Sequence, residues 1–337
     1  EVDDSFDGKT AVIDGFSGTV YLDPTPGILA VMKEKQDQSI RLKELMQQLK
    51  GLPSETVDGH RVEVAANVSS ASDLAAVLKN DAEGIGLFRS EFIYMGRDTL
   101  PSEEEQFNIY KLAIETMAGK RVIIRTLDIG ADKEASAFHL PKEENPALGM
   151  RAIRICLKRP EIFKTQLRAI LRASAFGKAA IMFPLITSVW EVWKAREILD
   201  EVRMELDKKG IAYDHHMEVG IMVETPAAAL ISDKLAKEVD FFSIGTNDLS
   251  QYTLVVDRTS RVLSDFFNPH HPAVLKLIQM TVENAHKAGI WVGMCGELGS
   301  DLSITETFLR MGVDEFSVAP YSELPLRKQI RSIDLSK

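Results

Sequence analysis

The stretch GIMVETP, residues 220–226, is an apolar run that leads into a glutamate, and DFFSIGTND, residues 240–248, repeats the pattern with an aspartate. Apolar runs of this kind, rich in β-branched residues, alternate with helix-like segments over most of the chain. They occupy residues 62–67, 84–88, 121–125, 180–186, 218–223, 240–244, 290–294 and 314–318. Near-continuous apolar runs are typical of parallel strands that helices cover on both faces. Eight such units over about 270 residues predict an α/β fold, a (β/α)8 TIM barrel, and an open doubly wound sheet is the alternative.

Two shorter segments precede the predicted barrel. Residues 10–22 have the pattern of two short strands around a glycine-containing turn, and residues 27–50 have the charge and leucine spacing of a helix. Gly51 and Pro53 end that helix. The chain begins at Glu1 without a methionine or a signal segment, so we expect it to be a fragment of a longer protein. The predicted boundaries are 1–26 for a hairpin remnant of another domain, 27–53 for a linker helix and 54–337 for the barrel.

The composition narrows the possible functions. A net charge of -10 argues against binding to nucleic acid, because such binding relies on many Lys and Arg contacts to phosphates. No apolar run approaches the roughly 18 residues of a membrane-spanning helix, so we expect no membrane role. The two cysteines, Cys156 and Cys295, lie far apart without a CxxC or metal-type spacing. This usage favours a reducing, cytoplasmic compartment.

Charged and reactive residues gather at the C-terminal ends of the predicted strands, where TIM barrels place their active sites. The residues at or just beyond these ends are Arg89, Glu91, Arg125, Asp128, Asp132, Lys133, Glu224, Asn247, Asp248 and Cys295. Arginines on neighbouring strands match the oxygens of carboxylates and phosphates. Carboxylates that face such arginines are the hard oxygen ligands by which Mg²⁺ is held beside phosphorylated substrates. The pattern predicts a site for a phosphorylated ligand and Mg²⁺.

Each of these residues also has a purely structural interpretation. A single arginine at a strand end is commonly a surface ion-pair partner. Glu224 and Asp248 are each followed by a helical pattern, and either carboxylate can cap the helix beside it. Cys295 can be a small buried apolar residue, although the glycines on both sides of it favour the close approach of a ligand.

Several chemistries are excluded by the motifs that the sequence lacks. It contains no GxxxxGK[ST] loop, no GxGxxG after a strand and no GxSxG elbow, so nucleotide and serine-hydrolase chemistry are not expected. His270 and His271 precede Pro272 and have no metal-ligand partners at suitable spacing. We interpret this pair as part of a loop or of a helix N-cap.

Taken together, the motifs resemble the phosphoenolpyruvate-binding domain of enzyme I of the bacterial sugar phosphotransferase system, within the PEP-utilising enzymes. The resemblance spans nearly the whole chain after residue 10. The motifs that carry it are GIGLFRSEFIYMGRDTLPSEEEQF, RTLDIGADKE, ENPALGMRAIR, GIMVETPAA, DFFSIGTNDLSQYTLVVDR and GMCGELGSD. Pyruvate phosphate dikinase and phosphoenolpyruvate synthase share the TND and MCGE elements, but the TLDIGADKE stretch and the short C-terminus are more similar to enzyme I.

The resemblance implies a role for each candidate residue. Arg89 and Arg125 match arginines that grip the transferred phosphate. Glu224 and Asp248 match Mg²⁺ ligands, and Cys295 matches the acid that protonates the enolate of pyruvate. The remaining matches are the substrate contacts Asn247 and Arg258 and two basic residues at the mouth of the site, Arg151 and Lys133.

The implied reaction moves phosphate from phosphoenolpyruvate to a histidine and releases pyruvate. In enzyme I that histidine lies in a separate N-terminal domain, whose TCHTAI-like stretch is absent here, and none of the seven histidines has such surroundings. The implied partners are this phosphohistidine domain, the phosphocarrier HPr that docks to it, and a second copy of the chain in a homodimer. We therefore expect the chain to bind the phosphate donor without completing the reaction alone.

Two other functions stay open on the residues alone. A divalent-metal pyruvate aldolase or lyase on a similar barrel would also use strand-end Glu and Asp ligands, but it would not need Arg89, Arg125 and Arg258 together. A noncatalytic module would bind phosphoenolpyruvate and dimerise without forming pyruvate. A ligand-dependent change in sedimentation without pyruvate would favour that second function.

Overall fold

The computed structural model describes residues 6–15, 17–130 and 136–337, and the chain divides into two compact units, residues 1–50 and 51–337. The first unit contains the antiparallel pair β1 (Ala11–Asp14) and β2 (Thr19–Leu22), followed by α1 (Pro26–Gln47). The Thr25 hydroxyl accepts a hydrogen bond from the Ile28 amide at 3.4 Å and so caps α1. The predicted hairpin and helix are therefore present. Their origin in a further domain stays a prediction.

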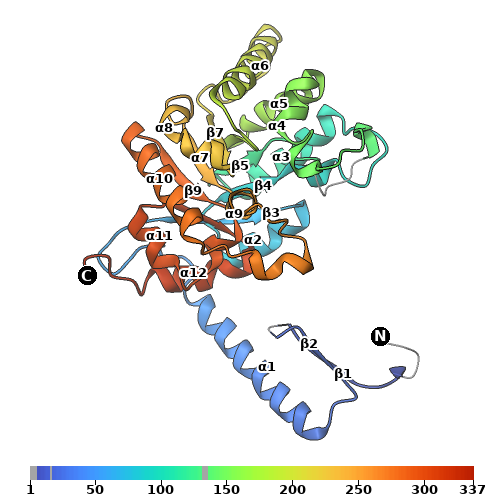
Figure 1. The fold of residues 1–337 in the computed structure, drawn as a ribbon, viewed down its shortest axis with the longest axis vertical. Helices are drawn as coiled ribbons and strands as arrows, with labels where there is room; N and C mark the ends of the chain where they lie inside the picture. The colour runs from blue at the N-terminus through green and yellow to red at the C-terminus, as the bar shows by residue number, and fades with distance from the viewer. Residues whose placement is uncertain (1–5, 16, 131–135) are drawn as a thin grey trace. The chain divides into compact units, whose positions relative to one another are not determined.

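The second unit is a closed barrel of parallel strands surrounded by helices (Figure 1). The strands are β3 (Glu63–Val68), β4 (Ile85–Arg89), β5 (Val122–Arg125), β6 (Ala179–Phe183), β7 (Glu218–Val223), β8 (Phe241–Ile244), β9 (Trp291–Met294) and β10 (Glu315–Val318). Because β10 pairs with both β9 and β3, the sheet has no edge. The predicted TIM barrel is confirmed, and the alternative of an open doubly wound sheet is wrong.

Helices follow the strands as the charge and apolar patterns predicted. The α-helices of this unit are α2 (Leu74–Asn80), α3 (Glu103–Thr116), α4 (Ile153–Lys158), α5 (Pro160–Ser174), α6 (Val189–Lys208), α7 (Pro226–Leu230), α8 (Ser232–Leu235), α9 (Thr246–Leu254), α10 (Pro272–Ala288), α11 (Thr305–Met311) and α12 (Glu323–Ile330). The short 3₁₀ segments are η2 (Ala71–Asp73), η3 (Ser90–Ile93), η4 (Ser136–Phe138), η5 (Pro146–Leu148), η6 (Arg261–Phe266), η7 (Glu297–Ser300) and η8 (Pro320–Ser322). Ser102 and Glu105 form a capping box that starts α3.

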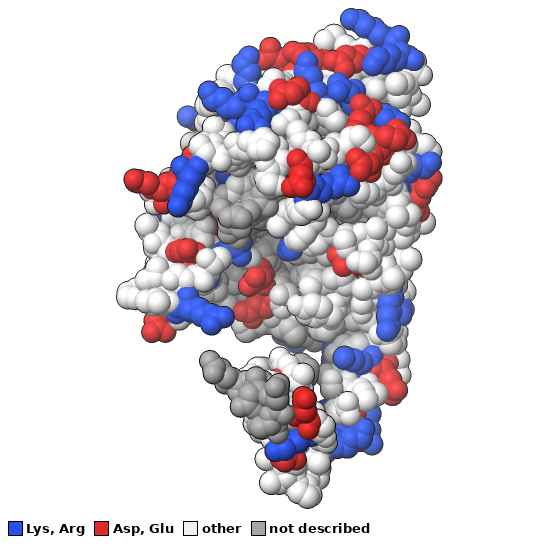
Figure 2. All heavy atoms as spheres, turned by 90° about the vertical axis from the view of Figure 1, so that its right-hand side faces the viewer, with Lys and Arg blue, Asp and Glu red and all other residues white. Residues whose placement is uncertain are grey.

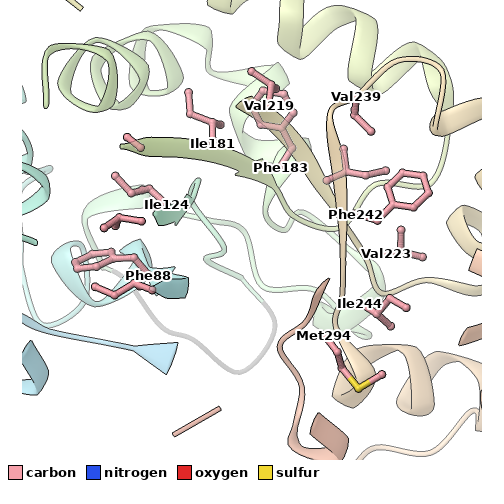
Figure 3. Close-up of a cluster of buried hydrophobic side chains, with 14 of the residues drawn as sticks. Phe88, Ile124, Ile181, Phe183, Val219, Val223, Val239, Phe242, Ile244 and Met294 are labelled. Carbon is pink, nitrogen blue, oxygen red and sulfur yellow. The ribbon is translucent and has the colours of Figure 1, made fainter. Parts of the chain in front are cut away.

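The strands separate two apolar cores because successive side chains point to opposite faces. On β6, Ala180 and Met182 face the inside of the barrel, whereas Ile181 and Phe183 pack against the helices. Figure 3 shows part of this outer layer. The inner core consists of Leu87, Ile123, Ala180, Met182, Met222, Phe241 and Cys295. The two layers explain why the strands are apolar almost throughout.

An ion cluster fills the N-terminal end of the barrel. Arg121 pairs with Glu63 at 2.7 Å, with Glu315 at 3.2 Å and with Glu218 at 3.5 Å. Its guanidinium carbon also lies 4.0 Å from the centre of the Trp291 ring. Burial, and then the charge of Glu63, raise the pKa of Glu315 to about 8. Packed side chains therefore close the interior of the barrel at this end.

The surface carries both signs of charge. On the face shown in Figure 2, acidic and basic side chains are interspersed without a broad area of one sign. Within the described residues, no helix combines the length and the apolar character needed to cross a lipid bilayer.

Candidate active site

The strand-end residues predicted from the sequence meet at the C-terminal rim of the barrel. Arg89 and Arg125 are the last residues of β4 and β5 and lie directly opposite each other in the register of this strand pair. Glu224 follows β7, and Cys295 follows β9. Asp248 lies in the first turn of α9, immediately beyond β8. Parallel strands end at the same rim, so residues far apart in the sequence converge there.

A hollow of about 210 Å³ brings the described candidates together. Its wall includes Arg89, Arg125, Arg151, Glu224, Asn247, Asp248, Arg258 and Cys295. Three further hollows, of about 540, 640 and 550 Å³, share residues of this wall. Lys133, which was also predicted to contact the substrate, and Asp132 lie outside the described residues.

Arg125 is buried between two carboxylates. One terminal nitrogen, Nη2, lies 2.6 Å from Glu91 Oε1, and the other, Nη1, lies 3.0 Å from Asp128 Oδ2. Burial disfavours the charge of Arg125, but Glu91 and Asp128 outweigh it and raise the pKa of the guanidinium above its usual value. Arg125 therefore stays charged and is held in one orientation. It is buried, so it is not the surface ion-pair partner that a single strand-end arginine commonly is.

Arg151 joins the β5 end to the β8 end. Its Nε lies 3.0 Å from Asp128 Oδ1, its Nη2 lies 2.7 Å from Asp248 Oδ2, and its Nη1 donates to the Tyr252 hydroxyl at 3.1 Å.

The segment before α4 that carries Arg151 passes close to Gly130. A Cβ atom at Gly130 would lie 2.7 Å from the Met150 carbonyl oxygen, and its φ of +111° favours glycine. No local pattern in the sequence predicted that the backbone at Arg151 would pack against Gly130.

Glu224 and Asp248 form an acidic pair that is only partly neutralised. Glu224 Oε1 accepts a hydrogen bond from the Leu185 amide at 2.6 Å. Burial raises the pKa of Glu224 to about 8, and the charges of Asp248 and Asp128 act in the same direction. Asp248 Oδ1 faces Arg258 Nε at 3.8 Å. The two carboxylates thus offer hard oxygen ligands in the same hollow as the arginines.

The Cys295 thiol is buried and protonated. The side chain is 4% exposed, and its sulfur lies 3.7 Å from the Ile244 carbonyl oxygen. Burial raises the pKa of the thiol to about 11, while the Ser243 side chain, Arg125 and Arg89 lower it by less. The sequence left open whether the arginines or burial would dominate. In the structure burial dominates, so the thiol carries its proton at neutral pH.

Helix capping does not account for Glu224 and Asp248. The N-cap of α7 is Thr225, whose hydroxyl accepts from the Ala228 amide at 3.1 Å. Asp248 directs its carboxylate to arginines instead of to the α9 amides. The interpretation of the histidine pair is confirmed for His271, which caps α10 through its side chain.

The sequence analysis did not identify the buried polar residues that connect the strand ends carrying Arg89 and Arg125. Gln166 on α5 is buried, and its amide accepts from the Leu127 amide at 2.8 Å and donates to Ser90 Oγ at 2.9 Å and to the Tyr110 hydroxyl at 3.1 Å. Ser90 and Leu127 lie just beyond the ends of β4 and β5. Gln166 therefore connects the two strand ends that carry Arg89 and Arg125. Its only sequence signal is a glutamine within the apolar face of a helix.

Sequence reasoning also missed Asn67, although the rule applied to the other strands could have found it. Asn67 lies near the C-terminal end of β3, and its Nδ2 donates to the Cys295 carbonyl oxygen at 3.1 Å. Its Oδ1 accepts from Ser317 Oγ at 2.8 Å. The first hydrogen bond contacts the backbone of Cys295, and the second orients the Asn67 amide that makes it.

The chemistry available at this rim is specific. The arginines can bind a small ligand that carries phosphate or carboxylate groups. Glu224 and Asp248 can take up a divalent cation together with ligand oxygens. The protonated thiol of Cys295 can deliver a proton to a ligand in the same hollow.

Comparison with known proteins places these motifs in a family. Residues 43–335 match the family described as PEP-utilising enzyme, PEP-binding domain. A phosphoenolpyruvate-protein phosphotransferase from Staphylococcus carnosus (strain TM300) is 49% identical over 330 residues, which are 98% of this chain and 58% of that protein. The protein of the same name from Bacillus subtilis (strain 168) is 49% identical over 326 residues, or 97% of this chain and 57% of that protein. The chain thus spans little more than half the length of these relatives.

A solved structure supports the fold alone. A citrate lyase from Burkholderia xenovorans LB400 superposes with a TM-score of 0.52 at 17% sequence identity, covering 84% of this chain and 81% of that protein. At this identity the similarity says nothing about the ligand or the reaction.

Proposed function

The chain belongs to the PEP-utilising enzymes, as their PEP-binding domain, and on this basis we propose that it binds phosphoenolpyruvate and Mg²⁺ at the barrel rim. We propose further that it serves as the donor-binding part of a phosphoenolpyruvate-protein phosphotransferase. The observation that carries the proposal is the single hollow lined by four arginines, Glu224, Asp248 and Cys295. A divalent-metal lyase would have no need of four arginines in one small hollow.

The residues present fit Mg²⁺. This ion is commonly held by one or two protein carboxylates together with phosphate oxygens and water. Glu224 and Asp248 supply two carboxylates, and no group of three or more metal-binding side chains occurs in the described part of the chain. Burial and the neighbouring acids Asp248 and Asp128 raise the pKa of Glu224 to about 8, so an added cation would stabilise its charged form. A cation there would compete with Arg151 and Arg258 for the oxygens of Asp248.

In the proposed reaction, the bond between phosphorus and the enol oxygen of phosphoenolpyruvate breaks, and a histidine nitrogen of another domain takes the phosphoryl group. The bound Mg²⁺ would neutralise charge on the phosphoryl oxygens. Arg89 and Arg125 orient the phosphoryl group. The electron pair of the broken bond leaves an enolate, and the Cys295 thiol gives its proton to the methylene carbon, which yields pyruvate and a thiolate. Solvent must reprotonate that thiolate before the next turnover.

The proposed partners rest on the resemblance of the sequence motifs to enzyme I. We propose that the phosphohistidine domain and HPr act with it, that two copies form a homodimer, and that the protein works in the cytoplasm. Both cysteines are free in the structure, as a reducing compartment requires. Analytical ultracentrifugation at micromolar concentration, with and without phosphoenolpyruvate and Mg²⁺, tests the dimer. A monomer under both conditions contradicts it.

Binding is best tested at Arg89. Arg125→Ala would remove an ion pair from each of two buried carboxylates, Glu91 and Asp128, so a loss of binding there could reflect misfolding. Arg89 has no ion-pair partner among the described residues, and Arg89→Ala should therefore fold normally. Losing a charge-assisted contact should weaken phosphoenolpyruvate binding at least tenfold, a change of roughly 1.5 to 3 kcal/mol.

The measurement is a calorimetric titration with phosphoenolpyruvate in the presence of Mg²⁺. Arg61→Ala is the matched control, because Arg61 is exposed and lies beside the N-terminal end of β3, so that its loss changes net charge equally. The control should bind as the unmodified chain does. Equal affinity of Arg89→Ala and the unmodified chain would refute the proposed site.

A further inference from the structure

The side chain of Asn247 is held on both sides by one residue, Glu297. The Glu297 amide donates to Asn247 Oδ1 at 2.9 Å, and Asn247 Nδ2 donates to Glu297 Oε1 at 3.2 Å. Asn247 belongs to the first turn of α9, and Glu297 begins η7, so the pair connects the segments that follow β8 and β9. Nothing in the sequence resemblance assigned a role to Glu297.

These two hydrogen bonds determine which way the Asn247 amide faces. A backbone N–H can only donate, so the atom that faces the Glu297 amide must be the oxygen Oδ1. A carboxylate can only accept, so the atom that faces it must be the nitrogen Nδ2. Turning the amide over would place Nδ2 against the Glu297 N–H, two donors together, and Oδ1 against the carboxylate, two acceptors together. One Nδ2 hydrogen is therefore committed to Glu297, and the second is left for a ligand.

The backbone around the pair leaves little freedom for movement. The Cys295 amide donates to the Ile244 carbonyl oxygen at 3.1 Å, which keeps the two segments in register. A Cβ atom at Gly296 would lie 2.5 Å from the Thr246 amide nitrogen, so only glycine permits this approach. The Asn247 amide is thus fixed by its surroundings as well as by Glu297.

The position of Glu297 is unexpected for a site that binds an anion. Glu297 and Asn247 both line the 210 Å³ hollow and two of the hollows that share its wall, those of about 540 and 550 Å³. The other acids of that wall either pair with arginines or, like Glu224, accept from the backbone. Glu297 makes no ion pair among the described residues. A carboxylate at this position repels an anionic ligand, so we expect Glu297 to contribute something else that offsets this repulsion.

We infer that Glu297 is a positioning residue that orients the Asn247 amide so that its free Nδ2 hydrogen meets an anionic oxygen of the substrate. This inference rests on the proposed function, because it assumes that Asn247 contacts phosphoenolpyruvate. Glu297 itself does not touch the substrate. Its carboxylate orients Asn247 and at the same time opposes the charge of the ligand, and these two effects can be separated by mutation.

Two substitutions at residue 297 have opposite expected effects. Glu297→Gln keeps an acceptor for Asn247 and removes the charge, so phosphoenolpyruvate should bind equally well or a few times more tightly. Glu297→Ala removes both, and the freed amide should lose part of its contact, which weakens binding by roughly three- to tenfold. Because residue 297 is exposed, both variants should fold, and thermal unfolding checks this. Stronger or unchanged binding by Glu297→Ala overturns the inference.

A double-mutant cycle tests whether Glu297 acts through Asn247. When Asn247 is already alanine, the Glu297 carboxylate has no amide to orient. Adding Glu297→Ala should then weaken phosphoenolpyruvate binding no further, and it should slightly improve binding because it removes a negative charge. If the two losses simply add, Glu297 does not work through Asn247. The affinities come from calorimetric titration of the 337-residue chain with phosphoenolpyruvate and Mg²⁺.

A second measurement needs no substrate and so separates this inference from the proposed function. The side-chain amide signal of Asn247 in a ¹⁵N-labelled protein can be identified by its absence in Asn247→Ala. It should shift in Glu297→Ala and stay near its original position in Glu297→Gln. If the unmodified chain does not bind phosphoenolpyruvate, the proposed function fails, and this signal still decides the positioning role. An Asn247 signal that is the same in Glu297→Ala as in the unmodified chain overturns that role.

Discussion

The thiol of Cys295 should ionise only in strongly alkaline solution, and this can be measured without the rest of the phosphotransferase. Burial raises its pKa to about 11. A pKa of about 11 leaves roughly one thiol in 10⁴ ionised at pH 7, whereas a free cysteine with a pKa near 8.5 is about 3% ionised. On the thiolate fraction alone, Cys295 should therefore react with an alkylating reagent about 300 times more slowly than a free thiol.

The assay is the rate of iodoacetamide labelling between pH 7 and pH 10, followed by mass spectrometry of the peptide that contains Cys295. The rate should rise about tenfold for each pH unit without a plateau, because only the thiolate reacts. Cys295→Ser removes the signal and identifies it. Cys156 is an internal control, since burial also raises the pKa of its thiol and the side chain is fully covered. A plateau below pH 8 would mean a thiolate at neutral pH and would refute the acid role.

Three further predictions follow from particular contacts. Cys295→Ala should keep its affinity for phosphoenolpyruvate but lose about 10²- to 10⁴-fold in pyruvate release when the phosphohistidine domain is supplied, because a positioned acid acts only after binding; normal release would assign the thiol to packing. Glu323 is buried with a pKa raised to about 9, chiefly by burial, so the folded state keeps a proton that the unfolded chain loses above its ordinary pKa of 4.5. Between pH 5 and pH 9, the free energy of unfolding measured in urea should fall by about 1.4 kcal/mol per pH unit in the unmodified chain relative to Glu323→Gln. If this free energy changed with pH in the same way for both proteins, the prediction would be contradicted. Gln166→Leu removes the hydrogen bonds that Gln166 makes with the Leu127 amide, the Ser90 hydroxyl and the Tyr110 hydroxyl, and it should lower the free energy of unfolding by about 3 kcal/mol. Gln279→Leu on the exposed face of α10 should change little, and equal effects of the two substitutions would contradict the role of Gln166 in connecting the two strand ends.

Much of the fold follows from patterns that a short window of sequence contains. The apolar runs at 84–88 and 218–223 became strands because residues buried on both faces must be apolar throughout. Residues at the ends of such runs could then be placed without coordinates, since parallel strands finish at one rim. Arg89, Arg125 and Cys295 were predicted on this basis. Arg151 and Arg258 lie in connections between strands, where chain position does not determine location, and only the family resemblance indicated them.

The sequence by itself determined which strands form and which side chains reach their C-terminal ends, whereas the pairing of β10 with β3 and β9 decided that the sheet closes into a barrel. Only the tertiary structure decided how those side chains pair. It joined Arg151 to both Asp128 and Asp248, left Arg89 without a partner among the described residues, and set Glu297 against Asn247. A hydrogen bond near 3 Å depends on rotamers and on strand register around the closed barrel. Those geometries arise from packing between residues far apart in the chain, so no local pattern of apolar and polar residues contains them.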